Sequence, residues 1–236
     1  MLELISFVGI DSKTNIDDLI KLQDNSGYPL EFGVLYSINK SGKHKRYPAY
    51  DECLKIFDKM YHHDLISSLH LCGSESIDGF FSDNEDIMRL VKKNFGRIQL
   101  NLNVNNYDED ELVDKILQKC ELNDIIIQHN KSKTSLIDKL ITYDNNRTCR
   151  EAISILYDAS GGYNKELTDI LPVFKTHFTG YAGGINPSNV KQINDKIHNL
   201  NKLESYYIDM ESGIRTDDWF DPELCRQVIK NVEIEW

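Results

Sequence analysis

Short apolar runs alternate with longer amphipathic segments along the whole chain. Runs of about four to eight branched and aromatic residues are typical of strands, and apolar residues spaced three or four apart are typical of helices. The predicted strands are Leu4–Gly9, Phe32–Tyr36, Leu65–Leu71, Arg97–Leu102, Asp124–Gln128, Ile153–Asp158, Thr176–Tyr181 and Ser205–Asp209. The predicted helices are Ile16–Leu22, Tyr50–Tyr61, Asn84–Lys93, Asp110–Cys120, Ser135–Ile141, Lys165–Ile170, Ser188–Leu200 and Pro222–Val232.

About eight strand-then-helix units result from this alternation. Such a repeat favours an α/β fold in which parallel strands close into a (β/α)8 TIM barrel rather than an open sheet. The chain has 236 residues, of which 40% are hydrophobic, and this is the size of one such barrel. We therefore expect a single domain over residues 1–236.

The first residues and the cysteines bear on the compartment. Met1–Gly9 resembles a first strand and lacks the basic leader and cleavage site of a signal peptide, and no apolar run is long enough to span a membrane. The cysteines are odd in number, scattered and never arranged as CxxC: Cys53, Cys72, Cys120, Cys149 and Cys225. This pattern favours free thiols over a disulfide framework or a zinc ribbon. A cytoplasmic protein is expected.

The net charge of -11 argues against nucleic acid or an anionic membrane as a partner, because affinity for phosphate backbones comes largely from Lys and Arg. A small phosphorylated molecule remains compatible with this charge, as do a monomer and a homodimer. No cofactor and no metal are expected. The signal for a metal site is weak: its candidate ligands come from separate predicted strands without a local spacing motif, and they are His70, His129 and Asp158.

Two glycine-rich turns follow the last two predicted strands. Residues 180–190 read GYAGGINPSNV, and residues 207–214 read YIDMESGI. Each is an apolar run that ends in small, turn-forming residues, which can present bare backbone amides to an anion. The loops after the last two strands of a (β/α)8 barrel are a frequent phosphate site. The sequence therefore predicts a phosphate cup near the C-terminus.

Polar residues stand at the ends of most predicted strands. The carboxyl ends of barrel strands and the loops after them form the active face, so these side chains are expected to converge on one rim. They are Asp11, His70, Cys72, Gln99, Asn101, Asn103, Gln128, His129, Asp158 and Asp209.

On these motifs the chain resembles the phosphoribosylanthranilate isomerase family of tryptophan biosynthesis. GGINPSNV at 183–190 matches the family's GG-[LI]-NP-x-NV, and DMESGI at 209–214 matches its D-V-S-S-G-V. Weaker matches are FVGI at 7–10, Arg46-Tyr47, IQL at 98–100 and LYD at 156–158. The resemblance implies an Amadori rearrangement, in which an N-linked phosphoribosyl aminoaldose becomes an aminoketose.

The resemblance also implies roles for particular residues. Asp158 stands at the position of the family's general acid, Asp209 at a substrate-orienting carboxylate, and Arg46 where the family holds the anthranilate carboxylate. The phosphate-loop positions are Gly183, Gly184, Glu211, Ser212 and Gly213. Gln99, Asn101 and His129 are further candidates for substrate binding, because they offer hydrogen bonds at the same rim.

One position departs from the family. The family's general base is a cysteine on the first strand, and this chain has Val8 at that position, which cannot accept a proton. His70, Cys72 and Asp11 are the candidate replacements. Glu211 replaces the first serine of the phosphate loop, and its carboxylate would repel a phosphate unless Arg215 or another cation compensates.

Two alternatives stay open. The phosphate cup could serve a lyase, hydrolase or different isomerase that acts on another phosphoribosyl or nucleotide-like substrate. It could also belong to a non-catalytic protein that binds and sequesters such a ligand, since loss of the family's base favours that interpretation.

Overall fold

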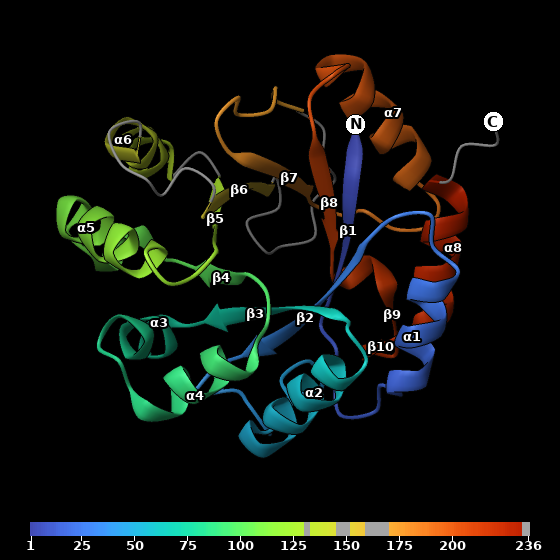
Figure 1. Ribbon diagram of the computed structural model, residues 1–236, viewed down its shortest axis with the longest axis horizontal. Helices are drawn as coiled ribbons and strands as arrows, with labels where there is room; N and C mark the ends of the chain where they lie inside the picture. The colour runs from blue at the N-terminus through green and yellow to red at the C-terminus, as the bar shows by residue number, and fades with distance from the viewer. Residues whose placement is uncertain (130–132, 145–151, 159–169, 233–236) are drawn as a thin grey trace.

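The computed structural model describes residues 1–129, 133–144, 152–158 and 170–232. Its centre is a closed barrel in which each strand pairs in parallel with the next and β8 pairs back onto β1 (Figure 1). The strands are β1 Leu2–Val8, β2 Leu30–Tyr36, β3 Ile66–Cys72, β4 Ile98–Asn101, β5 Ile125–His129, β6 Ile153–Asp158, β7 Phe178–Ala182 and β8 Tyr206–Met210. The predicted (β/α)8 barrel is confirmed.

Helices surround the strands on the outside of the barrel (Figure 1). They are α1 Ile16–Asp24, α2 Tyr50–His62, α3 Ser74–Phe81, α4 Glu85–Lys93, α5 Glu109–Cys120, α6 Thr134–Asp144, α7 Val190–Asn201 and α8 Pro222–Val232. Helix α3 has no counterpart among the predicted helices. The predicted helix Lys165–Ile170 lies, apart from Ile170, outside the described residues. A short hairpin of β9 Arg215–Thr216 and β10 Trp219–Phe220 precedes α8.

Side-chain caps fix where several helices begin. Asn84 accepts hydrogen bonds from the amides of Asp86 and Ile87, and Asp108 does the same for Asp110 and Glu111. These bonds satisfy amides that have no partner within the first helical turn.

No described helix combines the length and the apolar character that a membrane crossing needs.

The apolar core lies between the strands and the helix ring. Outward-facing strand residues such as Phe7, Phe32 and Leu69 are fully buried in one cluster with apolar helix residues that include Leu19 and Phe57. Because both faces of a closed barrel are covered, its strands carry long apolar stretches. This core leaves the residues that point into the barrel free to be polar.

The barrel interior is charged near the amino ends of its strands. We call the cluster of Glu31, Arg97, Ser154 and Tyr207 the floor of the barrel; it comes from β2, β4, β6 and β8 or the residue just before. Arg97 Nε and Nη2 donate to the two carboxylate oxygens of Glu31 at 2.8 and 2.9 Å. Its Nη1 donates to Ser154 Oγ at 3.3 Å, and its guanidinium lies 4.1 Å from the Tyr207 ring centroid. Four side chains from alternate strands thus close one end of the barrel.

Candidate functional site

A cavity of about 710 Å³ opens at the carboxyl ends of the strands, at the end opposite the floor. Its wall comes from the ends of the barrel strands and the loops that follow them. Most of the residues that the sequence singled out line it: Arg46, His70, Cys72, Gln99, Asn101, Asp158, Gly183, Gly184, Asp209, Glu211, Ser212 and Gly213. Two candidates, Asp11 and His129, are not among its lining residues.

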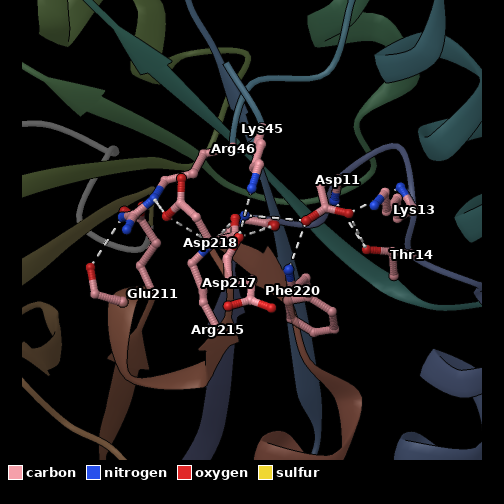
Figure 2. Close-up of polar contacts among 12 residues, drawn as sticks. Asp11, Lys13, Thr14, Lys45, Arg46, Glu211, Arg215, Asp217, Asp218 and Phe220 are labelled. Atoms are coloured by element: carbon pink, nitrogen blue, oxygen red, sulfur yellow. Dashed lines mark hydrogen bonds and ion pairs between the residues drawn. The ribbon is translucent and has the colours of Figure 1, made fainter.

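Asp11 is held in a structural network (Figure 2). One carboxylate oxygen accepts from the backbone amide of Phe220 at 2.7 Å and from Arg215 Nη2 at 3.2 Å. The other accepts from the Lys13 amide and the Thr14 hydroxyl. The carboxylate therefore anchors the β9–β10 hairpin to the loop after β1. These bonds engage both carboxylate oxygens of a residue that is not among those lining the cavity.

His129 lies against aromatic rings rather than in the cavity. Its ring centroid is 4.9 Å from that of Tyr157 and 6.1 Å from that of Phe174. Burial lowers its pKa, which is the behaviour of a histidine in an aromatic packing site. Its position on β5 alternates with Gln128, which does line the cavity.

The two glycine turns meet side by side in the cavity wall. A Cβ atom added to Gly213 would lie 2.0 Å from the carbonyl oxygen of Ile185, so only glycine allows this approach. Gly183 and Gly184 have φ values of 121° and 62°, which favour glycine for conformational reasons. Among the described residues, the amides of Gly183, Gly184, Ser212 and Gly213 donate to no backbone carbonyl. We call these four residues the glycine cup.

Arg46 lies over the edge of the glycine cup. Figure 2 shows it between Glu211 and Asp218, with Nη1 2.7 Å from Glu211 Oε1 and Nε 2.6 Å from Asp218 Oδ1. Nη1 also lies 3.1 Å from Ser212 Oγ. The guanidinium thus offsets the Glu211 carboxylate, whose charge would otherwise oppose an anion in the cup.

Asp158, whose strand partner Ala182 directly precedes the glycine cup, takes part in a short polar chain. Gln128 Nε2 lies 3.4 Å from Asp158 Oδ2, and Lys133 Nζ donates to Gln128 Oε1 at 3.3 Å. Burial lowers the pKa of Lys133 to about 8, and nearby Asp158 opposes that change. Sequence reasoning missed Lys133, because it lies in a polar run that resembles an exposed loop.

Asp209 is a deeply buried carboxyl of the cavity wall. Its Oδ2 has no hydrogen-bond partner among the described residues. Burial raises its pKa to about 8; Ser6 and Arg97 oppose the rise, while Glu31 and Asp158 add to it. A carboxyl with this pKa carries a proton at neutral pH.

The residues proposed from the sequence as replacements for the family's base differ in their protonation behaviour. Val8 lines the cavity at the family's base position. Burial raises the pKa of the Cys72 thiol to about 11, and Asn101 Nδ2 lies 2.9 Å from its sulfur. Burial lowers the pKa of His70 to about 4, and its Nε2 is 3.1 Å from Ser68 Oγ. At neutral pH Cys72 is therefore an uncharged thiol and His70 an uncharged imidazole.

Other ionisable groups give no sign of a metal site. Within the part of the chain that the structure describes, no three His, Cys, Asp or Glu side chains gather closely enough to hold a metal ion. Cys53, Cys72, Cys120 and Cys225 are buried free thiols, and Cys149 lies outside the described residues.

Comparison with known proteins agrees with the barrel architecture. No protein-family model matches the chain, and the curated proteins gave no match. Among solved structures, the chain is similar to N-(5'-phosphoribosyl)anthranilate isomerase from Pyrococcus furiosus, with 17% identity over 98% of both chains and a TM-score of 0.59. It is also similar to a putative spore coat polysaccharide biosynthesis protein E from Chromobacterium violaceum, with 10% identity over 98% of this chain and 73% of that one and a TM-score of 0.64. A truncated 3-deoxy-D-arabino-heptulosonate 7-phosphate synthase from Thermotoga maritima matches with 10% identity, 97% and 84% coverage and a TM-score of 0.57. At these identities the likeness establishes the (β/α)8 barrel fold.

Proposed function

We propose that this protein is an aldose–ketose isomerase that acts on an N-linked phosphoribosyl substrate of the phosphoribosylanthranilate type. One observation carries the proposal: the glycine cup and the carboxyls of Asp158 and Asp209 line the same cavity. The motifs at 183–190 and 209–214 support it. So does the likeness to the Pyrococcus furiosus isomerase over almost the whole of both chains.

The chemistry requires three functions from the site. A phosphate anchor fixes the sugar, an acid protonates the ring oxygen, and a base removes the proton from the neighbouring ribose carbon. The glycine cup provides amides for the phosphate. Gln99 and Asn101 offer hydrogen bonds to the sugar or to the group attached to it, and the guanidinium of Arg46 in the cavity wall offers a charge to an anionic group.

Direct turnover of phosphoribosylanthranilate tests the proposal. Conversion to the aminoketose should be separable by chromatography and should fall at least about 10²-fold in Asp158→Asn. Asp114→Asn, which changes an exposed carboxylate on α5, is the matched control and should behave as the parent protein. Absence of turnover at high enzyme concentration would reject this isomerase activity.

A second candidate function keeps the anion site and changes the chemistry. Val8 at the family's base position favours it, because a cavity without the expected base could serve another phosphoribosyl or nucleotide-like ligand, with or without catalysis. Calorimetric titration with ribose 5-phosphate and with small nucleotides separates the two. Tight nucleotide binding together with no turnover of the anthranilate substrate would favour this second candidate.

A further inference from the structure

Asp209 is buried, with the Ser6 hydroxyl as a hydrogen-bonding neighbour of its carboxyl group. It is 7% exposed, and its Oδ2 has no hydrogen-bond partner among the described residues. The nearby guanidinium of Arg97 is already committed, since it donates two bonds to Glu31 and a third to Ser154. An ionised carboxylate in such a place is costly, so the neutral acid is the favoured form.

Asp158 lines the same cavity as Asp209 but has different neighbouring groups. Its Oδ2 lies within 3.4 Å of the amide nitrogen of Gln128, and the same amide group accepts from Lys133. An amide donor and a lysine thus lie near Asp158, whereas Asp209 Oδ2 has no hydrogen-bond partner among the described residues. The two carboxyls therefore differ in environment in the way that separates an acid from a base.

We propose that Asp209 is the proton donor of the isomerisation and Asp158 the proton acceptor. This assignment rests on the proposed function, and it reverses the role that family resemblance implies for Asp158. It also assigns a proton acceptor in a cavity where Val8 stands at the position of the family's base and cannot take a proton.

The proton transfers balance over one turnover. Asp209 gives its proton to the ring oxygen as the bond from that oxygen to the first ribose carbon breaks, and the exocyclic nitrogen keeps its hydrogen and forms an iminium ion. Asp158 takes the proton from the second carbon, which yields an enaminol. Asp158 then returns its proton to the first carbon, and ionised Asp209 takes the proton from the hydroxyl on the second carbon, which forms the ketone and returns both carboxyls to their starting states.

Several charged or titratable groups face Asp209 from the surrounding strands. They are Glu31 on β2, Arg97 before β4, Asp158 on β6 and Tyr207 on β8, and His70 on β3 acts on Glu31. Glu31 and Arg97 neutralise each other through their ion pair. Loss of the Asp209 proton should therefore produce the basic limb of the profile of kcat/KM against pH, with activity falling above about pH 8.

Two measurements test the assignment, one of them independent of activity. In protein labelled with 13C at aspartate carboxyl carbons, one NMR signal should titrate near pH 8, vanish in Asp209→Asn and persist in the exposed control Asp114→Asn. Asp209→Asn should also lower kcat at least about 10²-fold at every pH while aminoketose binding stays within a few-fold. Asp209→Glu, which keeps an acid, should retain part of the activity with a shifted basic limb.

The outcomes separate the two levels of the proposal. Active wild-type protein together with an active Asp209→Asn variant, in which only KM rises and the pH profile is unchanged, would make Asp209 a positioning residue and overturn the assignment alone. Absence of any carboxyl titrating near pH 8 would also overturn it. Wild-type protein that never converts the anthranilate substrate would overturn the isomerase itself, and the assignment with it.

Discussion

Two groups of buried charge inside this barrel differ in how they are compensated. At the floor, Glu31 and Arg97 form a two-bond ion pair with Ser154 and the Tyr207 ring around it. In the cavity, Asp209 is buried with an oxygen that has no partner among the described residues. Burial alone would raise the pKa of Glu31, but Arg97 brings it below its usual value, whereas the pKa of Asp209 stays raised. A buried carboxylate that is paired with a cation stays ionised, whereas a buried carboxyl without such a cation has a raised pKa and can carry a proton near neutral pH.

Removal of the Arg97 guanidinium from the floor should have the largest effect on stability. Arg97→Met should destabilise the protein by about 3–5 kcal/mol, because it leaves the Glu31 carboxylate buried without its counter-charge. Urea unfolding measures this loss. The double variant Glu31→Gln with Arg97→Met removes both charges and should recover much of the stability. An Arg97→Met variant as stable as the parent would show that the pair is not needed.

Next in size is the effect of Asp158 on turnover. Asp158→Asn should reduce kcat/KM by at least about 10²-fold, about 3 kcal/mol of transition-state stabilisation, because an amide neither gives nor takes a proton at neutral pH. Its unfolding midpoint should move little. Steady-state kinetics beside the Asp114→Asn control checks this, and a loss of only a few-fold would remove Asp158 from the chemistry.

Removal of the Asp209 carboxyl should change the stability in the opposite direction to removal of Arg97 at the floor. Asp209→Asn should stabilise the protein by about 1–3 kcal/mol near pH 8, because it removes a buried group that is costly to ionise. The folded-state pKa of Asp209 lies above its ordinary value of 3.8, at about 8. The contribution of its protonated form to the free energy of unfolding is therefore fully present below about pH 4 and is lost as the pH rises through about 8.

The pH series therefore sharpens that prediction. The advantage of Asp209→Asn over the parent should grow between about pH 5 and pH 8, and taking the difference between variants cancels the titration of His70 and Lys133. Urea unfolding at several pH values gives the curve. A difference that stays flat with pH would place the Asp209 pKa near its ordinary value.

The smallest of these effects concerns the glycine cup. Gly213→Ala should weaken phosphate binding by about 10-fold, about 1.4 kcal/mol, because the added Cβ would lie 2.0 Å from the Ile185 carbonyl and push the two turns apart. Gly79→Ala in α3 is the control, since its added Cβ would lie 3.1 Å from the side-chain atom Ile87 Cγ1, far from the cup. Titration with inorganic phosphate measures the change, and equal binding by both variants would argue against the cup.

Local patterning was sufficient for the strands and for most helices. The structure gives β6 and α8 with the predicted bounds, and the other barrel strands differ from prediction by one or two residues at their ends, whereas the short strands β9 and β10 were not predicted. These elements are set by short-range periodicity, which the sequence carries directly. Helix α3 was missed because Ser74–Phe81 is short and follows β3 after one glycine, so its apolar residues merged with the strand pattern.

The candidate site was less accessible to sequence reasoning. The glycine turns could be predicted because each is a local motif, and so could the polar strand ends that line the cavity. The Glu31–Arg97 pair could not, because its members lie 66 residues apart and each looks like an ordinary polar residue at a strand start. Asp11 misled because a carboxylate just past a strand end can serve either a cavity or a hairpin, and only the contacts with Phe220 and Arg215 decide.

The contact of Arg46 with Asp218 bears on the order in which the cavity wall is built during synthesis. These residues are 172 positions apart, and the barrel itself closes only when β8 pairs with β1. Contacts of such long sequence separation form late, since most of the chain must be ordered before they are made. A nascent chain that ends before residue 218 would lack this ion pair, so this rim of the cavity is complete only after almost the whole chain has been made.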